Sequence, residues 1–366
     1  MKIECIRERL QNALLYTERS TSKNQNLPVL SCVLLTAKDN SLNIRATNLD
    51  IGVEIDIPVK VIEEGSIAVP GSILYSYIAG ISTEKNVLLE EKEGNLNIKS
   101  SKSSTLIKTL PSEEFPSLPY IEGGNSFSIN SKNLANGLKS VWYSASGSSM
   151  KPELSSIYIY NDGGEAVFVA TDSFRLAEKR VRVNDYNEGG SILIPFKNIP
   201  EIIKIFESMD GDVNVLFDKN QISFKNNSVY VVSRLVNGIY PDYKQIIPKT
   251  FLSEAIVLKQ DLVSSLKISN IFIDKFNMVN ISITTKDKKL NIATKNVDIG
   301  ENNSQISGSF SGDDVSNNFN YKYITDCFQS ISADSVSLGF GGIQKPLVLH
   351  GVGDKSFTYL IMPMNR

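Results

Sequence analysis

The chain has 366 residues, of which 41% are apolar, and a formal net charge of −2. This length predicts two or three domains, and the near-neutral charge argues against binding of nucleic acid through bulk positive charge. The three cysteines are far apart in the sequence, which excludes a disulfide framework and favours a reducing compartment. The chain also has no apolar run long enough to span a membrane and no secretory leader pattern, so we expect a cytoplasmic protein.

The first third of the chain combines helical and alternating patterns. Pro70 stands directly before a helical segment, a position where its missing N–H costs little. Three prolines and two glycines between residues 111 and 124 predict a linker. In chain order we predict a strand at 1–6, a helix at 7–19, a strand pair at 29–45, a helix at 71–82 and a strand pair at 86–110.

The rest of the chain repeats this order twice. Ser131 is a good N-cap for a helix that turns Leu134, Leu138 and Val141 inward. Further helices are predicted at 196–209, 259–268 and 321–331, and a second linker runs from Ile239 to Pro248. The predicted fold class is therefore α+β, with three repeated domains at 1–120, 125–248 and 252–366, each with two helices packed on antiparallel sheets.

One short phrase marks this repeat. Its three threonines are 124 and 123 residues apart, a period that indicates whole repeated domains rather than a solenoid. Two chains with three like domains each would close a ring if they joined head to tail. The copies are Ala46-Thr47-Asn48-Leu49-Asp50-Ile51-Gly52, Ala170-Thr171-Asp172-Ser173-Phe174-Arg175-Leu176 and Ala293-Thr294-Lys295-Asn296-Val297-Asp298-Ile299-Gly300.

Motifs that carry catalysis are sparse. The single histidine, His350, lies in an alternating run and is typical of a structural residue. Ser148 and Lys151 match S-x-x-K, but the S-D-N and K-T-G companions of acyl-serine enzymes are missing. Asp210-Gly211-Asp212 is more typical of a turn than of a cation site. We therefore predict no catalytic residue, no metal site and no cofactor.

The full length of the chain resembles the bacterial β sliding clamp, the processivity subunit of DNA polymerase III. The resemblance is carried by Leu27-Pro28-Val29-Leu30, by the phrase from Ala170 to Ala177, by Tyr240-Pro241-Asp242-Tyr243 and by the tail Met362-Pro363-Met364. It implies a non-catalytic homodimeric ring around duplex DNA that tethers polymerase and so raises its effective concentration. The implied partners are double-stranded DNA without sequence preference, a second copy, the polymerase III catalytic subunit, an ATP-driven clamp loader, and other polymerases and repair proteins that carry a clamp-binding peptide.

The family's pocket receives a short Leu/Phe-rich peptide between domains two and three. Flexible methionines and leucines suit a cleft that accepts several related peptides. The family often has histidine where this chain has Phe174 and arginine where it has Gln245, departures that bear on peptide preference. The matching positions are Leu154, Thr171, Ser173, Phe174, Arg175, Leu176, Pro241, Gln245, Ile246, Asn320, Tyr323, Leu360, Met362, Pro363 and Met364.

The resemblance also implies DNA contacts and a ring seam. The DNA contacts would be made to phosphate and be sensitive to salt, and the matching positions are Lys23, Asn24, Lys132, Lys139, Lys151 and Lys197. The seam would join domain one to domain three of the partner, with Leu106 and Ile107 on one side and Lys267 and Ile268 on the other. Lys99, Lys102 and Lys108 would face Asp298 and Glu301 across it.

Two other interpretations stay open at this point. The chain could be a scaffold that binds peptides but not DNA, or an enzyme that uses Ser148 and Lys151. Salt-dependent retention on circular DNA separates the clamp from the scaffold. A covalent acyl-serine probe tests the enzyme.

Overall fold

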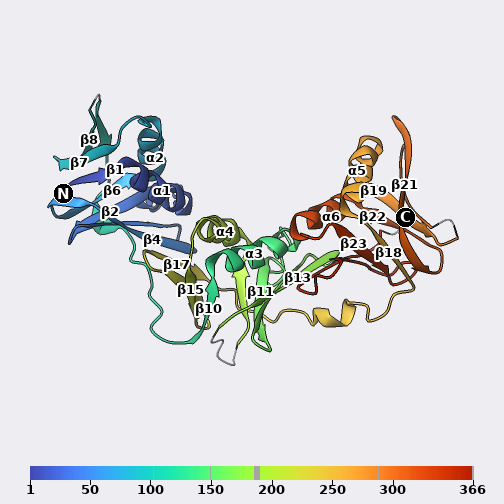
Figure 1. Ribbon diagram of the computed structural model, residues 1–366. Coiled ribbons are helices and arrows are strands. Elements are labelled where there is room, and N and C mark those ends of the chain that lie inside the picture. The colour runs from blue at the N-terminus through green and yellow to red at the C-terminus, as the bar shows by residue number, and fades with distance from the viewer. Residues whose placement is uncertain (102, 149, 185–189, 287, 365–366) are drawn as a thin grey trace. The chain divides into compact units, whose positions relative to one another are not determined.

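The computed structural model describes residues 1–101, 103–148, 150–184, 190–286 and 288–364 (Figure 1). These residues form two compact units. The first comprises Met1–Ala135, Val183–Gly189 and Lys197–Leu235, and the second comprises Asn136–Arg182, Gly190–Phe196 and Val236–Arg366. The middle third of the chain is thus shared between the units.

The first unit contains two antiparallel sheets. The eight-stranded sheet has the order β10-β15-β16-β17-β4-β3-β2-β6, and it is continuous because Val231 of β17 pairs with Val53 of β4. The five-stranded sheet has the order β5-β1-β7-β8-β9. The strands are β1 (Lys2–Ile6), β2 (Cys32–Lys38), β3 (Ser41–Thr47), β4 (Ile51–Pro58), β5 (Lys60–Glu63), β6 (Gly65–Pro70), β7 (Asn86–Lys92), β8 (Asn95–Lys99), β9 (Ser104–Lys108), β10 (Asn125–Asn130), β15 (Asp212–Phe217), β16 (Gln221–Asn226) and β17 (Val229–Arg234).

Amphipathic helices cover these sheets. Helices α1 (Arg7–Thr17) and α2 (Gly71–Gly80) pack on each other and on the strands of the first repeat (Figure 1). Leu10 and Leu14 of α1 are fully buried, as their spacing on one helical face requires. Helix α4 (Ile199–Glu207) buries Ile202 and Phe206 in the same way. Burial of such apolar stripes is the main stabilising contribution to this fold.

The second unit contains one long sheet. Its order is β14-β11-β12-β13-β25-β24-β23-β18-β21-β20-β19-β22, and the pair Leu176 and Leu360 joins β13 to β25 near the end of the chain. The strands are β11 (Ser156–Asp162), β12 (Glu165–Thr171), β13 (Arg175–Arg182), β14 (Ile192–Pro195), β18 (Ser253–Leu258), β19 (Met278–Thr284), β20 (Lys289–Asn296), β21 (Gly300–Gly312), β22 (Val315–Asn320), β23 (Ser335–Phe340), β24 (Leu347–Gly351) and β25 (Phe357–Ile361).

Three more helices complete the two helices of the second and third repeats. Helix α3 (Ser131–Val141) crosses the boundary between the units in sequence, α5 (Lys259–Ser269) packs on β20 and β21, and α6 (Tyr321–Asp326) follows β22. Position 137 of α3 requires glycine, because a Cβ there would be only 2.7 Å from the ring of Phe168. Each third of the described chain therefore has two α-helices on antiparallel strands, which confirms the predicted α+β fold class.

Several predicted elements differ in detail. The segment 86–110 contains three strands rather than two, because β9 adds a further edge strand after β8. The predicted helix at 321–331 changes to a 3-10 turn after Asp326. The first strand pair begins at Cys32, because Pro28–Ser31 forms a 3-10 turn.

Candidate functional site

The hairpin turn of the second phrase is fixed by its own side chains. Thr171 Oγ1 donates to the carbonyl of Arg175 at 2.6 Å and accepts from the backbone N–H of Ser173 at 3.2 Å. Asp172 Oδ1 accepts from the N–H groups of Phe174 and Arg175 at 2.9 and 3.0 Å. Ser173 has φ 77°, a left-handed conformation that non-glycine residues seldom adopt. This rigid turn leaves Phe174 61% exposed.

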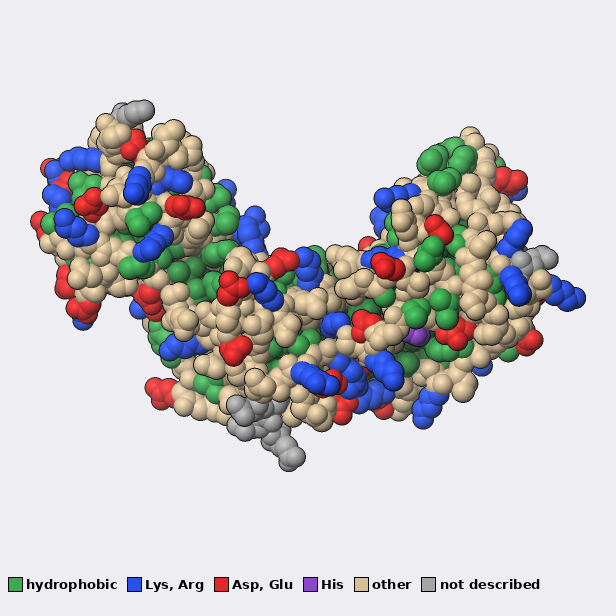
Figure 2. All heavy atoms as spheres, in the orientation of Figure 1, with side chains coloured by type: hydrophobic (Ala, Val, Ile, Leu, Met, Phe, Trp, Pro, Cys, Tyr) green, Lys and Arg blue, Asp and Glu red, His purple; other side chains and the backbone are tan. Residues whose placement is uncertain are grey.

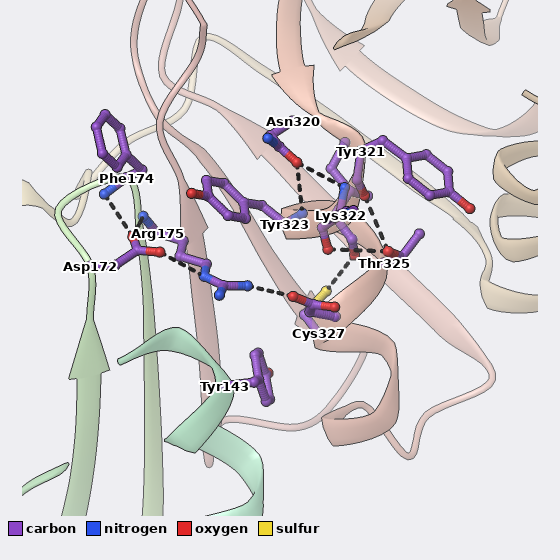
Figure 3. A network of polar contacts seen from close by, with 12 residues as sticks. Tyr143, Asp172, Phe174, Arg175, Asn320, Tyr321, Lys322, Tyr323, Thr325 and Cys327 are labelled. Carbon is purple, nitrogen blue, oxygen red and sulfur yellow. Dashed lines mark hydrogen bonds and ion pairs between the residues drawn. The ribbon is translucent and has the colours of Figure 1, made fainter. Parts of the chain in front are cut away.

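Arg175 lies behind the turn in a cage of acidic and aromatic groups (Figure 3). Its Nε is 3.0 Å from Asp172 Oδ2, and a terminal nitrogen is 2.5 Å from Asp326 Oδ2 of α6. The guanidinium stacks over the ring of Tyr323 at 4.4 Å and faces Tyr143 at 6.0 Å. Although burial favours the neutral form, the surrounding tyrosine and carboxylate groups raise the pKa of Arg175 above its ordinary value. Arg175 therefore stays charged and joins β13 to α6.

The tail of the chain is hydrogen-bonded both to this turn and to β22. The N–H of Met362 donates to the carbonyl of Phe174 at 2.8 Å, and the N–H of Met364 donates to the carbonyl of Asn318 in β22 at 2.8 Å. Met362, Pro363 and Met364 are each partly buried. Met362 is thus held beside Phe174, and Met364 beside Asn318, by backbone bonds that do not involve their side chains.

A closed apolar cluster supports the turn and the tail. Leu154, Leu176 and Leu360 are 6%, 0% and 0% exposed and belong to one buried cluster, against which Met362 packs. Tyr240 and Tyr243 of the second linker complete it. A surface with a closely packed apolar base and flexible methionine side chains over it can bind apolar side chains of varied shape.

The second linker is anchored by buried phenols. Tyr243 donates its hydroxyl proton to Glu178 Oε2 at 2.5 Å, and its hydroxyl is 2.8 Å from that of Tyr160. Tyr240 stacks on Tyr158 with ring centroids 4.6 Å apart. Burial, and then the bond to Glu178, raise the pKa of Tyr243 well above its ordinary value. The linker is therefore an integral part of the sheet surface rather than a loose connection.

The structure sorts the fifteen predicted pocket residues by exposure. Asn320 Oδ1 accepts from the N–H groups of Lys322 and Tyr323 and so caps α6, while Gln245 donates to Asp242 at 2.7 Å. The buried members are Leu154, Thr171, Leu176 and Leu360; the partly buried ones are Arg175, Asn320, Tyr323, Met362, Pro363 and Met364; the exposed ones are Ser173, Phe174, Pro241, Gln245 and Ile246. All lie in the second unit.

Sequence reasoning missed the groups that position Arg175 and the linker. Asp172 and Asp326 hold the guanidinium, and Glu178 accepts from Tyr243. A signal was present, since a strand arginine flanked by apolar residues needs carboxylates when it is buried, and a buried tyrosine needs a partner for its hydroxyl. The partner Asp326 is 151 residues away in sequence, so periodicity gave no means of finding it.

Family models match nearly the whole chain. The model for the DNA polymerase III beta subunit N-terminal domain matches residues 1–119, that for its central domain matches 128–242, and that for its C-terminal domain matches 244–365. The chain belongs to the DNA polymerase III beta subunit family. This membership confirms the family predicted from the sequence and, with it, a non-catalytic processivity subunit of DNA polymerase.

Individual relatives agree with this assignment. The beta sliding clamp of Staphylococcus aureus is 26% identical over 357 residues, with 95% of each chain covered. A crystal structure of the clamp of Bartonella birtlesii bound to griselimycin has a TM-score of 0.93 at 26% identity, with full coverage of both chains. The clamp of Pseudomonas aeruginosa bound to griselimycin has a TM-score of 0.95 at 22% identity, with the same coverage, and shows the shared fold.

The candidate DNA-contacting residues of this beta subunit are all exposed, but they differ in their partners. Lys197 is 2.5 Å from Asp50, and Lys132 is 2.6 Å from Asp210. Asn24 caps a local turn by accepting from the N–H groups of Asn26 and Leu27. On the face shown in Figure 2, basic and acidic side chains are intermixed within each unit. The remaining candidates, Lys23, Lys139 and Lys151, are exposed on a loop, on α3 and on a second loop.

The candidate seam residues lie at free edges or ends. Leu106 and Ile107 belong to β9, the last strand of its sheet, where Leu106 is 52% exposed and Ile107 only 4%. Lys267 and Ile268 lie in the last turn of α5, with Ile268 49% exposed. Ile271 beyond them is 63% exposed and was not predicted.

The predicted charge pairs across the seam have neighbours within their own units. Lys99 lies 3.5 Å from Glu90, and Glu301 lies 3.5 Å from Lys295. Lys102 lies outside the described residues. Attraction across a seam would therefore compete with these exposed pairs, each of which contributes little by itself.

The alternative catalytic and metal motifs find no further support. Ser148 and Lys151 lie in a loop between α3 and β11, and Ser149 between them is outside the described residues. His350 lies in β24, paired with Ser337. Among the described residues no group of three or more His, Cys, Asp or Glu side chains is placed to hold a metal ion. Within the same residues no helix is long and apolar enough to cross a membrane.

Proposed function

We propose that two copies of this chain close head to tail into a ring around double-stranded DNA. Each unit offers a strand edge for such a closure. Among the described residues β9 is paired on one side only, since it is the last strand of its sheet. Residues 301–307 of β21 pair with β20 on one side and are free on the other, because β18 pairs only with residues 308–312 of β21. Unpaired edges are normally covered in soluble proteins. Pairing of β9 with β21 of the second copy would cover both.

The surface around Phe174 is proposed as the docking site for partner peptides. The observation that carries this proposal is the fixed turn from Asp172 to Phe174 beside the Met362–Met364 tail, above the buried leucine cluster. Aromatic and methionine side chains on a rigid support are typical of binding hot spots. Arg175 acts here as a positioning residue, since its N–H groups bind Asp172 and Asp326 and a face of its guanidinium stacks on Tyr323.

The partners of this surface are the catalytic subunit of DNA polymerase III, the clamp loader, and other polymerases and repair proteins with a Leu/Phe-rich peptide. Griselimycin, which is bound in two of the related clamps, is proposed to bind here as well. Lys23, Asn24, Lys132, Lys139, Lys151 and Lys197 are proposed as weak phosphate contacts that permit sliding. We further propose clamp domains at 1–120, 125–248 and 252–366, a division supported by the similar ranges that the family models match. The protein is proposed to act in the cytoplasm.

Negative-stain electron microscopy of the purified protein tests this proposal, because it needs no loader, partner or DNA. Closed rings with a central hole are the expected result. Arcs at every protein concentration would contradict the ring and leave a peptide-binding scaffold. Retention on nicked circular DNA, and its loss when the circle is cut, would then distinguish topological binding from simple electrostatic attraction.

A further inference from the structure

The first copy of the repeated phrase folds into the same turn as the second. Thr47 Oγ1 donates to the carbonyl of Ile51 at 2.9 Å and accepts from the N–H of Leu49 at 3.0 Å. Leu49 has φ 74°, close to the 77° of Ser173. The N–H of Arg234 donates to the carbonyl of Asp50 at 2.9 Å, as the N–H of Met362 does to that of Phe174. The backbone that supports the Phe174 surface is thus present twice.

A cleft of about 270 Å³ lies beside this first turn. It is lined by Leu49, Val232 and the first linker, including Pro116 and Leu118. Gly52 occupies the position that corresponds to Leu176, and Leu118 fills the space, because a Cβ on Gly52 would be 2.5 Å from Leu118 Cδ2. The cleft floor is therefore apolar and preformed, but it is built from the linker instead of the strand.

The charges around the cleft favour an acidic ligand. Asp50 is neutralised by Lys197 at 2.5 Å. Arg234 lines the cleft and is exposed, and no carboxylate of the described residues lies within ion-pairing distance of its guanidinium. An arginine in this setting recognises a carboxylate through two parallel hydrogen bonds. At the second turn the corresponding position is Met362, which explains why the two surfaces would select different peptides.

We propose that this cleft is a second peptide-docking site, which takes a short extended segment with a leucine-sized side chain next to a carboxylate. The apolar side chain would rest on Leu118 and Pro116, and the carboxylate would pair with Arg234. The inference rests on the geometry of the first unit and is independent of the peptide site proposed around Phe174. The two sites would let one clamp hold two different partners at once.

The test uses the full chain and the peptide Asp-Leu-Glu-Leu, labelled with fluorescein at its N-terminus and amidated at its C-terminus. Asn-Leu-Gln-Leu with the same label and the same amide is the control that lacks the side-chain carboxylates. Arg234→Glu is expected to weaken binding of the acidic peptide at least tenfold. Lys225→Glu, the same charge change at an exposed position of β16, is expected to leave it within twofold. Arg234→Glu should leave binding of a Leu/Phe-rich peptide unchanged, and Met364→Ala should show the reverse selectivity.

Three outcomes would overturn the second site. The acidic peptide fails to saturate, it responds equally to Arg234→Glu and Lys225→Glu, or it is displaced fully by the Leu/Phe-rich peptide. A photoreactive leucine in the acidic peptide gives an independent readout. Crosslinks within Pro116–Pro119 would support the cleft, and crosslinks at the Phe174 turn would contradict it.

Discussion

The carboxylate of Asp326 lies 2.5 Å from the guanidinium of Arg175, and this contact links α6 to the turn that presents Phe174. The side chain of Arg175 is 12% exposed and that of Asp326 is 40% exposed. The pair is thus partly sheltered, and removal of the arginine leaves two carboxylates facing each other without a cation.

We expect Arg175→Ala to lower the free energy of unfolding by about 1–3 kcal/mol, because the largely buried carboxylate of Asp172, which is 14% exposed, loses its counter-ion, while the more exposed Asp326 contributes less. Urea unfolding, followed by fluorescence of the single tryptophan, measures this change. Arg182→Ala, an exposed arginine on the same strand, is the control and should change stability by less than about 0.5 kcal/mol. Equal effects of the two substitutions would show that the cage around Arg175 contributes nothing specific.

Met364→Ala is expected to weaken binding of a Leu/Phe-rich peptide by about 1–3 kcal/mol, the range of an anchor at an interface centre. Met364 is held by its backbone bond to Asn318, so the substitution removes the thioether without releasing the tail. Fluorescence anisotropy measures the affinity. Met150→Ala, which alters a methionine that is 89% exposed, is the matched control. Unchanged affinity for Met364→Ala would place the peptide elsewhere.

The sequence predicted what depends on local pattern and repetition. The buried stripe Leu134, Leu138 and Val141 of α3 was predicted by its spacing, and all three are fully buried. The repeat of the phrase at Thr47 and Thr171 predicted repeated domains, and in the structure the same hydroxyl bonds form in both of these copies. Contacts between residues far apart in sequence could not be predicted from local patterns. The ion pair of Arg175 and Asp326, for example, depends on how the second repeat packs against the third.

The third copy of the phrase shows a limit of this reasoning. Thr294 donates to the carbonyl of Ser269 in α5 instead of bonding within its own turn. The copy is one residue longer before its glycine, and its turn leaves Val297 95% exposed. The three similar sequences therefore all form a hairpin, but only the first two form the same hydrogen-bonded turn, because the added residue in the third copy changes the register of the bonds.

The burial of the candidate seam residues decides which substitutions can test the seam. Ile107→Asp would place a charge at a position that is 4% exposed, so it would unfold the sheet as well as open a ring. Leu106→Asp with Ile268→Asp changes two side chains that are 52% and 49% exposed, and we expect folded monomers by analytical ultracentrifugation. The control is Ile62→Asp, at 48% exposure on the opposite edge strand of the same sheet. A double variant that still sediments as a dimer would show that the seam lies elsewhere.

The bond from Tyr243 to Glu178 predicts a loss of stability in alkali. Since burial and then Glu178 raise the pKa of Tyr243 in the folded chain, the unfolded chain loses this proton first, and stability falls as pH rises above about 10. Tyr243→Phe removes the titrating group, so the slope of unfolding free energy against pH should be shallower by up to about 1.4 kcal/mol per pH unit. Near neutral pH the same variant should be less stable by about 1–3 kcal/mol, because the hydrogen bond to the carboxylate is lost. Identical alkaline slopes for the original protein and for Tyr243→Phe would show that Tyr243 does not cause the loss of stability in alkali.

The pair of Lys197 and Asp50 provides a two-sided test of DNA contact. If Lys197 contacts phosphate, Lys197→Ala should weaken binding of a short duplex and reduce the slope of log affinity against log salt concentration by about 1. Asp50→Asn should have the opposite effect on affinity at low salt, because it removes the carboxylate that lies 2.5 Å from the ammonium group. Lys60→Ala, which alters a lysine that is 73% exposed on β5, is the control for a change in net charge. Anisotropy of a labelled duplex over a series of salt concentrations gives both quantities. A change that is the same for Lys197→Ala and Lys60→Ala would mean that the duplex senses only net charge, and Lys197 would then be a solvated partner of Asp50.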